Sequence, residues 1–536
     1  MTNSWPPQVF TGCLPHATML DLAGRRFPSA KIDRSVEWLR SVLRQRQILF
    51  VLALTAAAAA LRFTTLGLQS FWYDETVTVS LVQKPLVAML RALPGSETTP
   101  PFYYLVAWPW ARIFGSSEFP LRALSAVAGT ATIPVVYAAG RAFVSRRAGL
   151  AVAAFAAFSP ILIWYSQEAR AYSLLVLVSA LSFLFFARAW EEPTRPLLIY
   201  WSLFSALAIA TYYFAAFLIA AEFVALLLRH GRRRHLWLAS AGPIGVTALV
   251  LPLAAYQART GNASWIHSLP LSLRVEETLR QLTTPAPAPL WAGAGIAEYN
   301  TRGRWLFALA LLAVALAALI FVAQKRERLR GLLALGVAAV VLIAPLLLSL
   351  AAHVFLGDHG DIFLYRGLLP AWLPLAIFVA AGLAVPRTGV IGVAAVSALC
   401  AASLWLVIQI DLDRSLQRDD WHALALAVNT TCETVVVVSP AYEAHALLHY
   451  RPDLRRTPPN GARADKLLVL HRRWTPGAAR RPAGFHPTAF QQVQYWTLRT
   501  FRAPQVVHIS AGALAAEAGP PPASATALEV AQSRCA

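Results

Sequence analysis

Charged residues are scarce in this chain. Only 14% of its 536 residues are charged and 57% are hydrophobic, whereas a soluble globular chain has roughly 25% charged residues. This composition argues against a wholly soluble protein and predicts a polytopic α-helical membrane protein. Lysine occurs only at Lys31, Lys84, Lys325 and Lys466, while arginine and alanine abound, a bias that is typical of a GC-rich bacterial genome. The net charge of +20 comes from basic residues that flank apolar runs. It therefore indicates membrane topology and not nucleic-acid binding.

Cysteine is also rare, and its four copies show no metal-ligand spacing, which argues against a zinc site. Cys400 lies inside an apolar run and Cys13 near the N-terminus. Cys432 and Cys535 share the C-terminal region, and they could pair as a disulfide if that region is outside the cytoplasm.

The sequence contains no motif for a nucleotide-sugar site and only a weak indication of a metal site. The loops that we expect in the cytoplasm lack a glycine-rich, phosphate-cradling turn, so no nucleotide-sugar site is expected. One predicted external loop could in principle hold a divalent ion, although its spacing matches no metal motif; its candidate ligands are His353, Asp358, His359 and Asp361. We expect no metal and no other cofactor.

Apolar runs predict about eleven transmembrane helices. They cover residues 47–62, 119–143, 150–165, 173–190, 197–212, 214–228, 236–256, 305–322, 332–352, 367–384 and 389–410. Arginine clusters follow several runs and should all be cytoplasmic under the positive-inside rule. They alternate correctly only if the helix opened by Pro100-Pro101 does not cross the bilayer. We therefore expect that helix to lie in the membrane interface, the N-terminus to be cytoplasmic and the C-terminus to be external.

Composition divides the chain into four parts. Residues 1–46 form a polar cytoplasmic lead, without a cleavage site that would mark a removed signal peptide. Residues 47–410 form the transmembrane domain. Residues 411–512 are charged and mixed, with a helix after Asp419-Asp420-Trp421 and a β-branched run at 434–438, which predicts a small external α/β domain. Residues 513–536 contain three consecutive prolines and are expected to be disordered.

The stretch Phe71-Trp72-Tyr73-Asp74-Glu75-Thr76 follows the first span at the mouth of the bilayer. Ionisable residues there are costly and are functional candidates by default. The alternative interpretation is a solvated acidic pair in a surface loop flanked by interfacial aromatics.

Six external pieces, in the same order, resemble the GT-C glycosyltransferases of the protein O-mannosyltransferase type, family 39, which include the aminoarabinose transferases that modify lipid A. The pieces are Phe71 to Thr76, Thr99 to Tyr104, Phe114 to Arg122, Trp164 to Tyr172, Leu364 to Pro370 and Asp420-Trp421. The resemblance implies a GT-C fold with interfacial helices in the first external loop. The family usually has histidine before the double proline, where this chain has Thr99, so no acceptor or metal role is carried over to that position.

The resemblance also implies an inverting transfer of a sugar from a polyprenyl-phosphate carrier. Such a transfer needs a carboxylate for the acceptor and a cation for the departing phosphate. Asp74 matches the catalytic acidic position of the family. Glu75 would orient Asp74 or bind the acceptor, or it would be structural and paired with Arg122 or Arg170.

Arginine presents a charged fork that matches phosphate oxygens. Arg366, with Tyr365, matches the arginine that the family places beside the donor phosphate, and Arg170 is a second candidate that Glu168 could hold in place. The alternative for both arginines is snorkelling to lipid headgroups. Further substrate-binding candidates are Trp72, Tyr73, Tyr103, Tyr104, Glu168 and Lys84, although an interfacial aromatic belt and a solvated lysine explain these residues without a ligand.

These observations predict a glycosyltransferase in a bacterial plasma membrane that acts on a glycan, lipid or protein acceptor at the outer face. A transporter or lipid flippase is the alternative from another class, and it would need polar residues within the spans. A non-catalytic scaffold for envelope assembly is a third reading. The sequence leaves the oligomeric state, the sugar and the acceptor open.

Overall fold

The computed structural model describes residues 29–263, 266, 269–283, 304–356, 363–472, 484–510, 513 and 525–531. The chain divides into two compact units, Met1–Ala53 and Leu54–Ala536. Helix α1 (Ser29–Phe63) contains the boundary, and the second unit carries everything described below.

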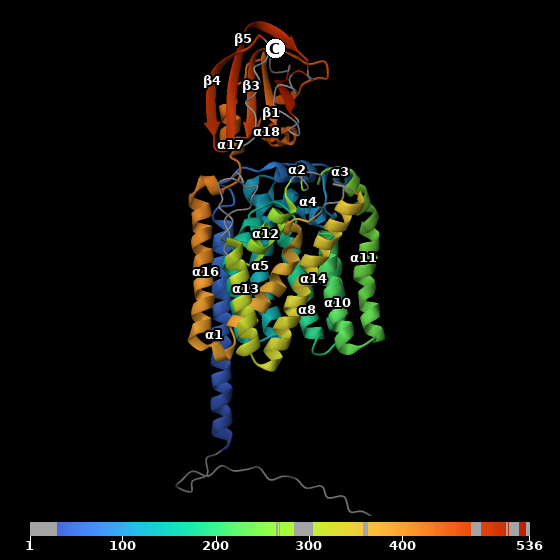
Figure 1. The fold of residues 1–536 in the computed structure, drawn as a ribbon, viewed down its shortest axis with the longest axis vertical. Helices are drawn as coiled ribbons and strands as arrows, with labels where there is room; N and C mark the ends of the chain where they lie inside the picture. The colour runs from blue at the N-terminus through green and yellow to red at the C-terminus, as the bar shows by residue number, and fades with distance from the viewer. Residues whose placement is uncertain are drawn as a thin grey trace, which may run out of the picture. The chain divides into compact units, whose positions relative to one another are not determined.

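Helices make up most of the second unit up to Leu412. After α1 they are α2 (Tyr73–Val82), α3 (Leu86–Ser96), α4 (Phe102–Phe114), α5 (Glu118–Phe143), α6 (Arg146–Phe158), α7 (Pro160–Ser166), α8 (Tyr172–Ala189), α9 (Arg195–Thr211), α10 (Ala215–His230), α11 (Arg234–Arg259), α12 (Leu271–Thr283), α13 (Arg304–Phe321), α14 (Lys325–Leu356), the 3₁₀ helix η4 (Tyr365–Ala371), α15 (Trp372–Leu383), η5 (Pro386–Thr388) and α16 (Gly389–Leu412). Figure 1 shows α5, α8, α10, α11, α13 and α14 running side by side, with α2 and α3 lying across their ends.

Seven helices in the described residues are long and apolar enough to cross a membrane, or eight if the bent pair α6–α7 counts as one span. All eleven predicted runs are helical, so a polytopic helical fold is confirmed. The count of eleven spans is not confirmed. The difference lies in short helices such as α9 and α10, which have 17 and 16 residues, near the lower limit of about 17 residues for a crossing.

The bend between α6 and α7 has an identifiable cause. The two helices meet at 55° where Pro160 lacks the N–H that would bond to the carbonyl of Ala156. The guanidinium of Arg62, 1% exposed, donates to the carbonyls of Ala156 at 3.0 Å and Ala157 at 3.2 Å. A buried arginine therefore satisfies the main-chain acceptors that the bend leaves open.

The segment between α1 and α5 folds as three short helices packed on the end of α5. Helices α2, α3 and α4 share a buried cluster that includes Phe71, Val79, Met89, Tyr103 and Leu121. Helix α4, opened by the double proline, has 13 residues and is roughly 20 Å long, which is too short for a bilayer core of about 30 Å. This length agrees with the expectation that it does not cross.

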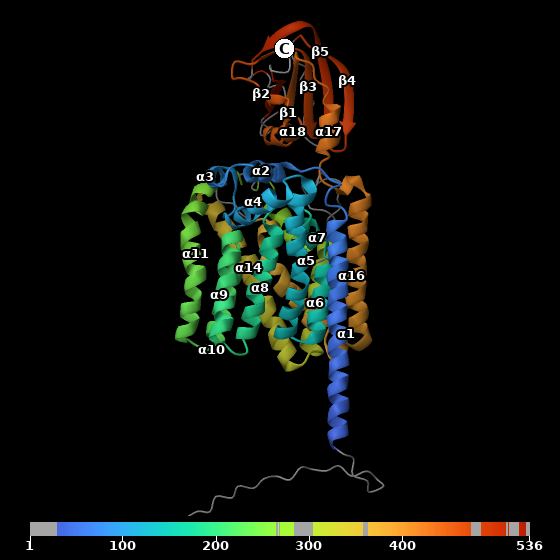
Figure 2. The ribbon, with the colours of Figure 1, turned by 180° about the vertical axis from the view of Figure 1, so that it is seen from behind.

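The C-terminal region folds around one mixed sheet. Its strands are β1 (Thr434–Ser439), β2 (Leu454–Arg456), β3 (Ala462–Arg472), β4 (His486–Val493), β5 (Trp496–Ile509) and β6 (Thr526–Val530), in the spatial order β2-β6-β1-β3-β5-β4. Only β1 and β3 pair in parallel, with Val435 opposite Leu467, among the described strands. Helices α17 (Trp421–Ala427) and α18 (Ala444–Tyr450) share a buried cluster with residues of β1 and β3. The 3₁₀ turns η6 (Arg414–Leu416) and η7 (Ala441–Glu443) precede them. Figure 2 shows the strands β1 to β5 beside one another.

The structure tests the predicted disorder of the C-terminal tail, but it does not test the predicted pairing of Cys432 with Cys535. The expectation of disorder throughout 513–536 is wrong for β6, because Leu528 of this strand is fully buried and pairs with Val436 of β1. Cys432 is disulfide-bonded, and Cys400 is free. Cys535, the predicted partner of Cys432, lies outside the described residues, as does Cys13.

Candidate active site

Asp74 lies in the first turn of α2 and contacts Arg366, which is 292 residues further along the chain. The Arg366 guanidinium donates to a carboxylate oxygen of Asp74 at 3.1 Å. Both side chains keep some exposure, 17% for Asp74 and 13% for Arg366. The structure therefore brings the predicted base and the predicted phosphate-binding arginine together in one partly open position.

Local sequence explains why each residue stands there. Helix α2 begins after Trp72, whose N–H donates to the Glu75 carboxylate at 3.4 Å, and two acidic residues in the first turn suit a helix N-terminus. Arg366 lies on η4, where a Cβ on Gly367 would come within 2.7 Å of the Phe214 ring. Glycine at 367 lets this turn pack close to α10.

Glu75, next to Asp74, is fully enclosed. Its two oxygens accept from the Arg122 guanidinium at 2.7 and 2.5 Å, and one of them accepts from the Ala169 N–H at 2.8 Å. Burial alone would raise the pKa of Glu75, but the charge and hydrogen bonds of Arg122 hold it below its usual value. Arg122 also donates to the carbonyls of Leu66, Gln69 and Ser70. Of the roles that the sequence left open for Glu75, the structure therefore places it in the ion pair with Arg122.

Arg170 is enclosed in the same way, by a residue that sequence reasoning missed. Its two terminal nitrogens donate to the carboxylate oxygens of Glu97 at 2.6 and 2.8 Å, and one nitrogen also donates to Tyr104 Oη at 3.0 Å. The expectation that Glu168 holds Arg170 is wrong, because Glu97 fills the guanidinium fork, and a phosphate contact for Arg170 stays a prediction. No local pattern marks Glu97, which lies in the short stretch before the double proline.

Glu168 instead faces Arg418 of the segment between α16 and the sheet, at 3.8 Å. Neither oxygen of Glu168 has a hydrogen-bond partner among the described residues. Burial raises the pKa of Glu168 to about 7, against the opposing effect of the Arg418 charge. Arg418 lies over the Trp164 ring, 4.2 Å from its centroid, and donates to the Trp164 carbonyl at 3.1 Å.

The aromatic candidates divide into buried and accessible rings. Tyr103, Tyr104 and Tyr365 are each 1% exposed and belong to core clusters. A substrate contact for Tyr103 and Tyr104, and a donor-phosphate contact for Tyr365, stay predictions. Trp72 and Tyr73 stay partly exposed. The Trp72 ring N–H lacks a hydrogen-bond partner in the described part of the chain.

Tyr73 meets the C-terminal domain. Its ring packs edge-on against Tyr442, with 5.2 Å between centroids, and lies 6.2 Å from His445. Burial and the neighbouring Asp74 carboxylate raise the pKa of Tyr73. Behind Tyr442, the Arg472 guanidinium pairs with both Asp419 and Glu443. The C-terminal domain thus supplies polar and aromatic groups beside the residue that precedes Asp74.

The remaining candidates are Lys84 and the possible metal ligands of one predicted external loop. Lys84 is exposed beyond the end of α2, roughly 15 Å along the helix from Asp74. The proposed metal ligands Asp358, His359 and Asp361, and the side chain of His353, lie outside the described residues. Among the residues that are described, no three His, Cys, Asp or Glu side chains form a group that could hold a metal ion.

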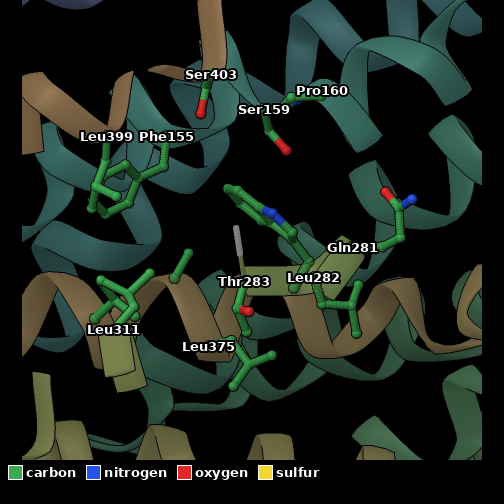
Figure 3. Close-up of a pocket in the computed structure, with 13 residues that line it drawn as sticks. Phe155, Ser159, Pro160, Gln281, Leu282, Thr283, Leu311, Leu375, Leu399 and Ser403 are labelled. Atoms are coloured by element: carbon green, nitrogen blue, oxygen red, sulfur yellow. The ribbon is translucent and has the colours of Figure 1, made fainter. Parts of the chain in front are cut away.

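A cavity of about 60 Å³ lies among the membrane helices. Figure 3 shows aliphatic and aromatic side chains lining it, together with the polar groups of Ser159, Gln281, Thr283 and Ser403. Trp372 and Leu375, near the start of α15, contribute to the wall. None of the lining residues belongs to the Asp74 cluster, so the cavity suits an apolar chain better than the reacting groups.

Residues 98–256 match the family model described as dolichyl-phosphate-mannose-protein mannosyltransferase. The resemblance predicted from the motifs is confirmed. The matched segment is less than a third of the chain, and it contains Glu168 and Arg170 but neither Asp74 nor Arg366. A comparison with proteins of curated function found no match.

Three solved structures are similar to this chain. ArnT from Cupriavidus metallidurans bound to undecaprenyl phosphate is 14% identical, covers 84% of this chain and 97% of its own, and has a TM-score of 0.49. The Archaeoglobus fulgidus oligosaccharyltransferase is 15% identical over 70% of this chain, with a TM-score of 0.39. The S. cerevisiae protein O-mannosyltransferase Pmt1-Pmt2 complex bound to the sugar donor is 16% identical over 41%, with a TM-score of 0.31.

The chain spans about half the length of the archaeal enzyme (55%) and about a third of the yeast chain (35%). At these identities and TM-scores, the three structures carry no argument about the chemistry of this chain. The function has to be argued from the site.

Proposed function

We propose that this protein transfers a sugar from a polyprenyl-phosphate donor to a glycan, lipid or protein acceptor at the outer face of a bacterial plasma membrane, with inversion at the anomeric carbon. The observation that carries the proposal is the partly open contact between Asp74 and Arg366. It joins the two charges that such a transfer needs, a base for the acceptor and a cation for the leaving phosphate.

The step balances with these two residues. Asp74 takes the proton of an acceptor hydroxyl as its oxygen bonds to the anomeric carbon. The bond between that carbon and the phosphate oxygen breaks, and its electron pair leaves with the polyprenyl phosphate, whose charge Arg366 stabilises. Because Arg366 supplies the positive charge, we propose that no metal ion or other cofactor takes part.

Two features of the surroundings support a lipid donor. Trp372 and Leu375 of the apolar cavity follow Arg366 by six and nine residues, which along a 3₁₀ turn and the start of a helix is on the order of 10 to 15 Å. A hydrocarbon chain from a phosphate at Arg366 would reach that cavity. The arginine clusters between the apolar runs support an outer-face location, because the positive-inside rule predicts that they are cytoplasmic and that α2 and η4 lie on the opposite side.

The test is transfer of label from a panel of synthetic polyprenyl-phosphate sugars to envelope acceptors by the purified protein. Asp74→Asn is expected to lose on the order of a hundredfold in rate, the scale of a lost general base. Asp413→Asn is the matched control: Asp413 is exposed and caps the Ser415 N–H at 2.8 Å, a bond that asparagine also makes. Full activity in Asp74→Asn would refute the assignment of the base.

One observation favours the transporter alternative. Glu222 of α10 is fully buried, and one of its oxygens accepts from Ser182 Oγ at 2.7 Å and from Trp201 Nε1 at 2.8 Å, while the other has no partner in the described residues. An ionisable residue inside a membrane bundle is a functional candidate. If no donor is turned over, lipid translocation in liposomes by wild type and Glu222→Gln becomes the next measurement, and loss of translocation in the variant would support transport.

A further inference from the structure

The segment 69–71, which leads into the Asp74 helix, is held from two directions. From the membrane side, Arg122 donates to the carbonyls of Gln69 at 2.7 Å and Ser70 at 2.9 Å. These bonds leave the side chains of Gln69 and Ser70 and the N–H of Phe71 for other partners.

The C-terminal region supplies all of those partners. The Arg418 N–H donates to Gln69 Oε1 at 3.1 Å. The Ser70 hydroxyl donates to the Asp419 carbonyl and accepts the Trp421 N–H, both at 2.8 Å. Three residues that are about 350 positions away thus fix a segment that ends three residues before Asp74.

Tyr450 makes the remaining contact and extends it. Its hydroxyl accepts the Phe71 N–H at 2.6 Å and donates to Glu118 Oε1 at 2.8 Å. Phe71 is fully buried, and its ring lies 5.7 Å from that of His449. One hydroxyl on α18 therefore connects the main chain before α2 with the start of α5.

We propose that the C-terminal domain positions the catalytic helix α2, and that Tyr450 is the positioning residue that carries this effect through the Phe71 main chain. The proposal rests on the proposed function for Asp74. Tyr450 does not touch the reacting groups; it fixes where the first turn of α2 begins and hence the direction of the Asp74 carboxylate. Displacement of a reacting group by about 1 Å can cost on the order of a hundredfold in rate.

The test uses the full chain in detergent or nanodiscs and compares Tyr450→Phe with two controls. Tyr450→Phe keeps the ring, which packs 4.4 Å from His422, and removes only the hydroxyl. Tyr495→Phe removes a hydroxyl that donates to the Ser415 carbonyl in the same domain without touching 69–71. Glu118→Gln keeps an amide oxygen that accepts the Tyr450 hydroxyl.

We expect kcat to fall about tenfold or more in Tyr450→Phe, with the KM of donor and acceptor within about twofold of wild type, and near-wild-type kcat in both controls. Hydrogen exchange of peptides covering residues 66–82 should be faster in Tyr450→Phe alone. A kcat in Tyr450→Phe equal to that of Tyr495→Phe overturns the proposal, even if exchange rises, because the bond would then be structural only. An equal loss in Glu118→Gln overturns it in favour of the Glu118 charge.

Failure of the proposed function gives a different result. In that case wild type turns over no donor, and hydrogen exchange of peptides covering residues 66–82 alone tests whether the C-terminal domain orders α2. Exchange in Tyr450→Phe that matches Tyr495→Phe would then show that the domain does not order α2.

Discussion

Two sets of ion pairs surround the first turn of α2, and they differ in how far solvent reaches them. The closed set comprises Glu75 with Arg122, at 0% and 1% exposure, and Glu97 with Arg170, at 2% and 8%. The open pair is Asp74 with Arg366, at 17% and 13%. Buried ions lose hydration and need several hydrogen bonds in return, which the closed pairs have. The open pair is the most exposed of the three, so a substrate can reach it, and we infer from this difference that the closed pairs are structural and the open pair is the reaction centre.

The largest expected effect comes from breaking a closed pair. Arg122→Leu leaves the Glu75 carboxylate buried without its partner and should lower the free energy of unfolding by about 3–5 kcal/mol. Arg455→Leu is the matched control, because Arg455 pairs with Glu529 on the surface at 45% exposure, and exposed pairs contribute about 1 kcal/mol or less. Thermal unfolding of both purified variants checks this. Similar losses in the two variants would remove the distinction between closed and open pairs.

Glu168 sharpens the comparison, because it is as buried as the closed pairs but lacks their hydrogen bonds. Its folded pKa of about 7 lies above the usual 4.5, so the folded protein binds more protons than the unfolded chain between these values. The contribution of Glu168 to stability should therefore be fully present below pH 4.5 and be lost as pH rises to about 7, by on the order of 3 kcal/mol.

Glu168→Gln should remove this component of the pH dependence, and unfolding midpoints between pH 4.5 and 8 test it. Glu433→Gln, a carboxylate in the turn before β1, is the control. If the unfolding midpoint of Glu168→Gln depends on pH in the same way as that of wild type, the Glu168 carboxylate is ionised throughout this pH range.

The third prediction separates the two arginine candidates. Arg366→Lys loses the planar fork at the open pair and should raise the donor KM about tenfold with little change in stability. Arg170→Lys loses the two bonds to Glu97 and should lower the unfolding midpoint, with the donor KM within about twofold of wild type. Donor titrations and thermal unfolding of both variants test this prediction. A raised donor KM in Arg170→Lys, with an unchanged donor KM in Arg366→Lys, would indicate that Arg170 binds the phosphate.

The smallest effect is expected at Lys84, which is exposed and apart from both sets. Lys84→Ala should change stability by no more than about 0.5 kcal/mol and leave the donor KM unchanged. A several-fold increase in donor KM would place the substrate over a longer stretch of α2 than the open pair covers.

Much of the fold could be predicted from the sequence because apolar runs and turn residues are local signals. The run predicted at 119–143 is helix α5, Glu118–Phe143, and the β-branched run at 434–438 is β1, Thr434–Ser439. Strand β6 could not be predicted in the same way. Its five residues follow a proline-rich stretch and become a strand only by pairing with β1 and β2.

The site was less predictable, since its partners are distant in sequence. The position of Asp74 after the first span made it a candidate, but its role as the base and the choice of Arg366 came from the resemblance to a family, and the contact between the two spans 292 residues. The partner of Arg170 was missed because Glu97 is 73 residues away, in a loop without a motif. The contacts of Tyr450 and Arg418 with the segment before α2 depend on the docking of the C-terminal domain, which composition does not encode.

The central claim is that the open pair is the reaction centre, and a structure of the full chain with bound polyprenyl phosphate tests it most directly. The account predicts phosphate oxygens within about 3 Å of the Arg366 guanidinium, the Asp74 carboxylate released from that arginine, and both closed pairs unchanged. A phosphate bound at Arg170, or an Asp74–Arg366 contact that persists with the lipid bound elsewhere, would contradict it.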